Sequence, residues 1–132
     1  MYFTDENALG LGKLLHRAGR DDVVYPGHPD LPEIPLGTFD LDWMPLVGAR
    51  QMIVLTRERR IRTRPVELTA YQEHGIRSVR IGSKRDLSPQ DQMDMLLRHE
   101  RRIELEAVKL GPGPWALLLT NQGVRQIRLR EP

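Results

Sequence analysis

The sequence predicts a three-layer α/β/α domain of the Rossmann-like type with a mainly parallel central sheet. Strand-like and helix-like segments alternate along the chain. The run QMIVLT, residues 51–56, is apolar without alternation, which is typical of a strand covered on both faces. A length of 132 residues suits a single domain with one core. We therefore expect residues 1–132 to form one domain.

The first quarter of the chain is predicted to contain two short strands and a helix, followed by an irregular loop. The first strand ends before Asp5, and Asn7 is expected to cap the helix that follows it. A second strand, DVVYP, ends at Pro26. Residues 27–38 contain three prolines, which cannot pair regularly in a sheet, so an extended surface loop is expected there.

The rest of the chain continues the alternation. A short helix is expected after the loop, with Asp42 as its cap and Pro45 in its first turn. Beyond the apolar strand, the expected elements are a helix opened by Pro65, a strand at 76–81, a long helix from Ser88 to Gly111, a buried strand PWALLLT and an edge strand VRQIRLR. The long helix is expected to bury an apolar stripe formed by Met93, Leu96, Leu97, Ile103 and Ala107.

The composition excludes several kinds of site. The chain has no cysteine, which removes disulfides, thiolate nucleophiles and cysteine-based metal centres. With 20 Lys+Arg against 18 Asp+Glu the net charge is +2, so only the distribution of charge can indicate a partner. No apolar run reaches the roughly 18 residues that a membrane span needs, and Asp5 and Glu6 interrupt any signal-peptide pattern. A cytoplasmic protein without membrane contact is expected.

Carboxylates from distant parts of the sequence are expected to meet at one edge of the sheet, because sites in open parallel sheets lie beyond the carboxyl ends of the strands. The candidates are Asp5, Glu6, Asp40, Asp42 and Glu58. Two carboxylates about 4 Å apart repel by roughly 4 kcal/mol at an effective dielectric near 20, so a proton or a cation must relieve them. Oxygen ligands suit Mg²⁺ or Mn²⁺, and such an ion can polarise a phosphate. The alternative is that these acids are solvated loop and cap residues.

A run of arginines follows the same edge in the segment TRERRIRTRP. It contains Arg57, Arg59, Arg60, Arg62 and Arg64. The guanidinium group is a planar donor fork that fits phosphate oxygens, and positive charge lets a polyanion approach a site rich in carboxylates. Two other side chains could also contact a ligand. One is His28, in the loop of residues 27–38, the proline loop. The other is Trp43, which is expected to pack in the core but lies near enough to the site to stack on a base.

Three stretches together carry a resemblance to a known family. The segments FTDEN, VVYPGHPDLPEIPLGTFDLDW and IVLTRERRIRTRPVE resemble those of a PIN-like domain of the VapC toxin type. The resemblance extends over nearly the whole chain and implies the Rossmann-like fold. It also implies Mg²⁺- or Mn²⁺-dependent endoribonuclease activity on RNA, and the role of a toxin that pairs with a cognate antitoxin protein.

The resemblance assigns roles to individual acids. Asp5 matches the invariant first-strand aspartate, and the acid after the long loop is Asp42 or Asp40. Glu58 stands where this branch usually has Asp after Thr-Arg. The longer side chain displaces the carboxylate by about one methylene, and an error of about 1 Å at a catalytic site can cost on the order of a hundredfold in rate.

In the implied mechanism, Asp5, Asp42 and Glu58 hold the metal ion, while Arg57 and Arg59 position the phosphodiester. A rival function is a catalytically weak or inactive α/β module that binds RNA or a protein through its arginine face, and the glutamate at position 58 favours it. A nucleotide-binding Rossmann domain is a third possibility, although no glycine fingerprint follows the first strand. The sequence leaves open whether the protein forms a homodimer.

Overall fold

The computed structural model of the chain describes residues 1–57, 64–83 and 85–129. Strands and helices alternate along these ranges, as the sequence predicts. In chain order the elements are β1 (Tyr2–Thr4), the 3-10 turn η1 (Glu6–Ala8), α1 (Leu9–Arg17), β2 (Val23–Val24), α2 (Asp40–Ala49), β3 (Ile53–Thr56), α3 (Pro65–Glu73), β4 (Arg77–Ile81), α4 (Pro89–Leu110), β5 (Trp115–Thr120) and β6 (Gly123–Ile127).

The described strands form one six-stranded sheet in the order β2-β1-β3-β4-β5-β6. All neighbours pair in parallel except β6, which lies antiparallel to β5 at the edge. Because β2 lies on one side of β1 and β3 on the other, the sheet changes its direction of growth between β1 and β3. Ligands of open α/β sheets bind at such a switch point, beyond the carboxyl ends of the strands. The predicted mainly parallel α/β/α fold is confirmed.

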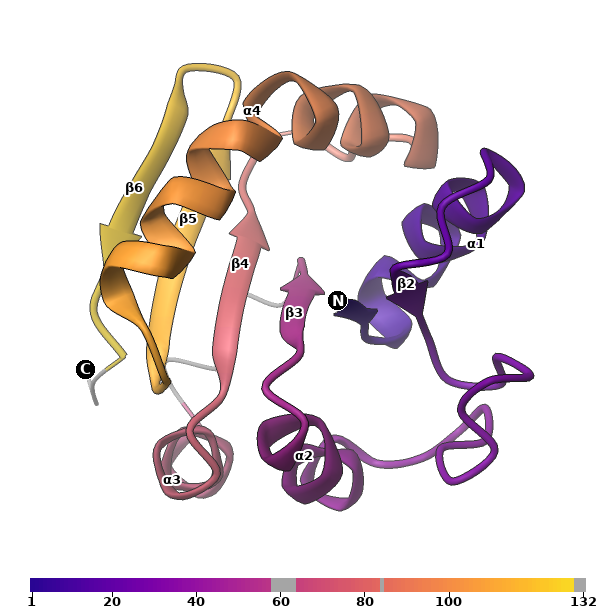
Figure 1. Cartoon of the computed structure of the whole chain (residues 1–132), viewed down its shortest axis with the longest axis vertical. Coiled ribbons are helices and arrows are strands. Elements are labelled where there is room, and N and C mark those ends of the chain that lie inside the picture. Colours follow the sequence, from indigo (N-terminus) through magenta and orange to yellow (C-terminus); the bar gives the residue numbers. More distant parts are fainter. Residues whose placement is uncertain (58–63, 84, 130–132) are drawn as a thin grey trace.

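Two apolar cores lie on opposite faces of the sheet, because successive strand residues point to opposite sides. Tyr2 and Leu55 contribute to the core beneath α1 and α4. Phe3 and Val54 contribute to the core beneath α2 and α3. The helices divide in the same way, because α1 contacts α4 and α2 contacts α3; Figure 1 shows α2 and α3 side by side. The sheet is therefore the middle of three layers.

The helix after β1 begins differently from the prediction. Asp5, not Asn7, is the capping residue: its Oδ1 accepts a hydrogen bond from the backbone N–H of Ala8 at 3.1 Å, and the turn η1 precedes α1. The helix α1 then packs closely on β1. A Cβ atom on Gly12 would lie 2.3 Å from the Thr4 Oγ1, so only glycine fits this contact.

The helix α2 also differs from the prediction in its first turn. Its N-cap is Phe39 instead of Asp42, and Pro45 lies inside the helix and not in its first turn. A proline in a helix lacks an N–H and leaves the carbonyl four residues earlier without its helical donor. Here that carbonyl belongs to Leu41, and both Leu41 and Pro45 are exposed, so water can supply the missing hydrogen bond.

The long helix α4 begins and ends where the sequence predicts. The Ser88 Oγ accepts a hydrogen bond from the Asp91 N–H at 3.1 Å, and the chain leaves the helix at Gly111 with φ +71°. The predicted apolar stripe is wrong at one position, because Leu97 is 47% exposed and Met95 is buried in its place. Among the described residues, no helix combines the length and the apolar character needed to cross a membrane.

Arg20 joins the segment after α1 to α4 through two carboxylates. Its Nε and one terminal nitrogen donate to Asp22 at 2.9 and 2.8 Å, and its two terminal nitrogens donate to Glu100 at 3.1 and 2.7 Å. The side chains of Arg20 and Glu100 are mostly buried. The hydrogen bonds from Arg20 hold the pKa of Asp22 below its usual range. Burial, together with the Glu100 carboxylate, raises the pKa of Tyr2.

We expect Arg20→Gln to lower the free energy of unfolding at pH 7 by about 1–2 kcal/mol, because charge-assisted hydrogen bonds at a partly exposed site are lost. Arg20 lowers the pKa of Asp22 in the folded protein, whereas an unfolded Asp titrates near 3.9. The contribution of this pair is therefore present above about pH 4 and is lost as the pH falls through the folded pKa. Urea denaturation between pH 7 and pH 3 measures the effect.

Arg17→Gln is the matched control for this variant. Arg17 is an exposed arginine in the last turn of α1, so its replacement should change the free energy of unfolding by less than about 0.5 kcal/mol. A stability difference between Arg20→Gln and the wild type that grows as the pH falls below 4 would contradict the role given to the Arg20–Asp22 pair.

Candidate functional site

Asp5 lies directly beyond the carboxyl end of β1, at the switch point of the sheet. It is 3% exposed. Its Oδ1 accepts the N–H of Ala8 at 3.1 Å, and its Oδ2 accepts the hydroxyl of Thr56 at 2.5 Å. The Asp5 backbone N–H donates to the Leu55 carbonyl at 3.4 Å. Both strands that flank the switch point therefore hold this carboxylate in place.

Trp43 connects a second carboxylate to β1. Its indole ring lies 4.7 Å, centroid to centroid, from the ring of Phe3 in β1. Its Nε1–H donates to the Oδ1 of Asp40 at 3.0 Å. Asp40 is half-buried, whereas Asp42 is exposed on the same helix. The sequence left the choice between these two acids open, and the structure links Asp40, through Trp43, to β1, the strand that Asp5 directly follows.

Glu6 contacts the proline loop instead of the switch point. Its Oε1 accepts the backbone N–H of Gly37 at 2.5 Å, and Gly37 has φ +89°, which favours glycine. The loop is not purely a surface segment, because Leu31 and Ile34 are buried in the core beneath α2. This hydrogen bond from Gly37 to Glu6 therefore holds the proline loop beside the end of β1.

His28 and Trp43, the two side chains predicted as further ligand contacts, pack against other residues of the protein. His28 is buried; its Nδ1 accepts the N–H of Asp30 at 2.9 Å, and its Nε2 lies 3.3 Å from the Nδ1 of His16. Trp43 is 1% exposed. The expectation that Trp43 packs in the core is confirmed, and the idea that it stacks on a base is wrong because its ring has no exposed face.

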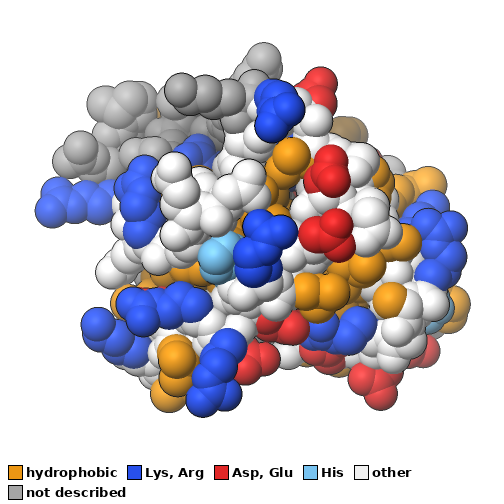
Figure 2. All heavy atoms as spheres, turned by 90° about the horizontal axis from the view of Figure 1, so that it is seen from above, with side chains coloured by type: hydrophobic (Ala, Val, Ile, Leu, Met, Phe, Trp, Pro, Cys, Tyr) orange, Lys and Arg blue, Asp and Glu red, His pale blue; other side chains and the backbone are white. Residues whose placement is uncertain are grey.

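Two residues of the arginine run TRERRIRTRP are described, Arg57 and Arg64, and both make contacts inside the protein. Arg57 donates to the carbonyls of Leu87 and Arg85 at 3.3 and 3.4 Å, and Arg64 pairs with Glu67 at 3.2 Å. Arg59, Arg60 and Arg62 lie outside the described residues. Figure 2 looks onto the end of the molecule to which β3 and β4 point, and Lys and Arg side chains gather over its left half.

Within residues 1–57, 64–83 and 85–129, no three Asp, Glu or His side chains converge as a group that could hold a metal ion. Glu58, the third ligand that the sequence predicts, lies outside these ranges. The three-carboxylate site therefore stays a prediction. Its described candidate acids are Asp5 at the switch point and Asp42 or Asp40 on α2.

Sequence reasoning missed Thr56, although this side chain holds the central carboxylate. Thr56 ends the apolar run QMIVLT, and a β-branched residue there reads as one more strand position. The available signal was its place: a hydroxyl at the last residue of a buried strand, on the edge where the acids were expected.

Comparison with protein families gives one finding. A family model described as a PIN like domain matches residues 1–83, from β1 to the end of β4. The matched part contains Asp5, Asp40 and Thr56, while α4, β5 and β6 lie outside it. No curated protein and no solved structure matches the chain. PIN domains are generally nucleases that use divalent metal ions.

We expect Thr56→Val to lower the free energy of unfolding by about 1–3 kcal/mol. The variant keeps the branched shape but removes the hydroxyl, so a buried carboxylate loses a hydrogen bond. Urea denaturation at pH 7 measures the change. Thr56→Ser keeps the hydroxyl and loses one methyl group, so it should cost about 1 kcal/mol or less. Equal stability of Thr56→Val and the wild type would contradict the role of this hydrogen bond.

Proposed function

The chain belongs to the PIN-like domain family, and we propose that it is a Mg²⁺- or Mn²⁺-dependent endoribonuclease. The observation that carries the proposal is the buried Asp5 carboxylate at the switch point between β1 and β3, held by the Ala8 N–H and the Thr56 hydroxyl. A buried carboxylate is costly unless it is hydrogen-bonded or paired with a cation. Its place is the one at which open α/β sheets bind ligands.

The chemistry of the residues at this edge fits a hard divalent cation. A carboxylate offers about four acceptor positions, so two hydrogen bonds and a cation can share it. Mg²⁺ and Mn²⁺ prefer oxygen ligands. We propose Asp5, Asp40 and Glu58 as the ligands, with Asp42 as the alternative second acid. An ion bound there would polarise the phosphate and lower the pKa of a water molecule.

The surrounding residues have positioning roles in this proposal. Ala8 and Thr56 fix the orientation of the Asp5 carboxylate, and the Trp43 indole fixes that of Asp40. Glu6 holds the proline loop beside the site. Each of these contacts limits the movement of a carboxylate or of the loop, and misplacement by about 1 Å can cost on the order of a hundredfold in rate.

The arginine run supports RNA as the substrate. A guanidinium has five N–H donors, so Arg57 can keep its two contacts to backbone carbonyls and still reach a phosphate oxygen. Arg57 and Arg59 would position the phosphodiester, and the remaining arginines of the run would attract the polyanion. Binding carried by such contacts weakens as the salt concentration rises.

The resemblance of the sequence to the VapC type suggests a biological role. We propose that the protein is the toxin of a toxin–antitoxin pair and that a cognate antitoxin protein is its partner. A small neighbouring reading frame for a DNA-binding protein would support this role. The second candidate function is a weakly active or inactive module that binds RNA or a protein through its arginines, and the glutamate at position 58 favours it.

Cleavage of a mixed-sequence RNA with Mn²⁺, and with EDTA in place of the metal, tests the proposed activity. We expect EDTA to abolish cleavage, and Asp5→Asn and Asp40→Asn to reduce it by on the order of a hundredfold or more. Both variants should also lose Mn²⁺ binding in calorimetric titration. In Asp5→Asn the amide oxygen can still accept the Ala8 N–H while the amide NH2 donates to the Thr56 hydroxyl, and in Asp40→Asn the amide oxygen still accepts from Trp43, so urea denaturation should show that the fold survives.

Asp42→Asn is the matched control, since Asp42 is an exposed acid of the same helix. It should retain cleavage and Mn²⁺ binding. A loss in Asp42→Asn with full activity in Asp40→Asn would instead identify Asp42 as the second acid. Cleavage that persists in EDTA and in Asp5→Asn would exclude the metal-dependent mechanism, and RNA binding without cleavage would favour the second candidate.

A further inference from the structure

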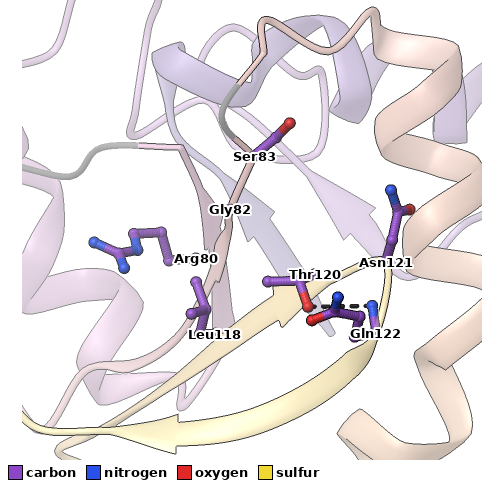
Figure 3. A pocket seen from close by; sticks show the side chains of 7 residues that line it. All are labelled: Arg80, Gly82, Ser83, Leu118, Thr120, Asn121 and Gln122. Atoms are coloured by element: carbon purple, nitrogen blue, oxygen red, sulfur yellow. Dashed lines mark hydrogen bonds between the residues drawn. The ribbon is translucent and has the colours of Figure 1, made fainter.

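A pocket with a mixed polar and apolar lining opens where β4 and β5 end. Its volume is about 560 Å³, within the range of about 300–1,000 Å³ typical of small-molecule sites. The side chains that define it come from the end of β4, from β5 and from the turn before β6: Arg80, Ser83, Leu118, Thr120, Asn121 and Gln122. Figure 3 shows them around the ends of the two strands. Most of this lining lies outside the part of the chain that matches the family.

The pocket lies at the carboxyl ends of the strands, as Asp5 does. The strands β1, β3, β4 and β5 run parallel, so their carboxyl ends lie on one side of the sheet. Adjacent strands lie about 4.8 Å apart, which places β4 and β5 about 10 and 14 Å from β1. Single-stranded RNA that crosses the edge at Asp5 therefore extends to this pocket within a few nucleotides.

The turn before β6 presents two amide side chains from a fixed backbone. Thr120 Oγ1 accepts the N–H of Gln122 at 3.2 Å, as the dashed line in Figure 3 shows. The Asn121 carbonyl lies 3.3 Å from the His99 Nε2. The amides of Asn121 and Gln122 are on exposed residues, so both can reach a ligand. A side-chain amide donates and accepts at once, which matches the edge of a nucleobase.

The charge of the pocket suits a nucleic acid. Among the described residues that line it, Arg80 is the only charged one, and Figure 3 shows Arg80 on the opposite side of Leu118 from the two amides. Leu118 offers apolar surface between them. The neighbouring pocket of about 280 Å³ shares Asn121 but is lined by three carboxylates, those of Asp86, Asp91 and Asp94, against two arginines, Arg85 and Arg98, so its described charged residues favour a phosphate less. The pocket between β4 and β5 is thus the better of the two for a nucleotide.

We propose that this pocket binds one unpaired base of the RNA substrate, with a preference for adenine, through the amides of Asn121 and Gln122. Asn and Gln pair with adenine through two hydrogen bonds, to N6 and N7. Unstacked bases of single-stranded RNA are recognised along their edges in this way. Arg80 adds positive charge for the adjoining phosphate. The inference rests on the proposed ribonuclease function, because it assigns the substrate of that site.

Fluorescence anisotropy with labelled five-nucleotide RNAs, all adenine or all uracil, tests the proposal. The Asp5→Asn chain in EDTA keeps the RNA intact under the proposed mechanism. We expect the adenine oligomer to bind more tightly than the uracil oligomer. Asn121→Ala combined with Gln122→Ala should weaken adenine binding about tenfold and leave uracil binding nearly unchanged. Gln126→Ala, an exposed glutamine of β6 outside the pocket, is the matched control and should change neither.

Equal binding of the two oligomers by the parent chain would overturn the adenine preference. Adenine-selective binding that survives the double replacement would overturn the assignment to this pocket, provided that urea denaturation shows the variant to be folded. Failure of the ribonuclease proposal has a different signature, since wild-type protein would then cleave no RNA with Mn²⁺ while the adenine-selective binding and its loss in the double variant would persist.

Discussion

The hydrogen bond from Thr56 to Asp5 joins the two strands between which the sheet changes its direction of growth. The buried Asp5 carboxylate needs hydrogen-bond donors, and the register of β1 against β3 places one of them, the Thr56 hydroxyl, beside it. Thr4 lies opposite Leu55 in the parallel pair of β1 and β3, so Asp5 and Thr56, each one residue further along, meet beyond the ladder. A shift of one residue in this register would turn the side chains of the shifted strand to the other face and so separate Asp5 from Thr56.

The same register explains the placement of Asp40. Phe3 precedes Asp5 by two residues, so the two side chains share a face of the sheet. Trp43 packs against Phe3, and a buried indole N–H needs an acceptor, which Asp40 provides from one turn earlier in α2. Asp42, two residues after Asp40, points to another side of the helix. Packing of an aromatic pair therefore places one acid toward β1 and the other in solvent.

The sequence predicted the fold because the strands are short segments, either apolar throughout or with apolar and polar residues mixed as in β4 and β6, and turn residues bound them, a signal that is local. Asp5 was also predictable, since its place at the end of the first strand is visible in the sequence. Three features depend on contacts between remote residues and were not predictable. Asp5 takes over the cap expected of Asn7, Thr56 contributes a hydroxyl that reads as a strand residue, and the Trp43 indole donates to Asp40.

The structure separates the proposed chemistry from the proposed recognition. The acids and their hydrogen-bonding partners lie within residues 1–83, the part that matches the PIN-like family, and their positions depend on the central strands. Asn121 and Gln122 occupy an exposed turn between β5 and the edge strand β6. Substitution in this turn leaves the β1–β3 pairing and both cores intact, because neither side chain belongs to a core. Base preference can therefore change in such a fold while the carboxylate site stays the same.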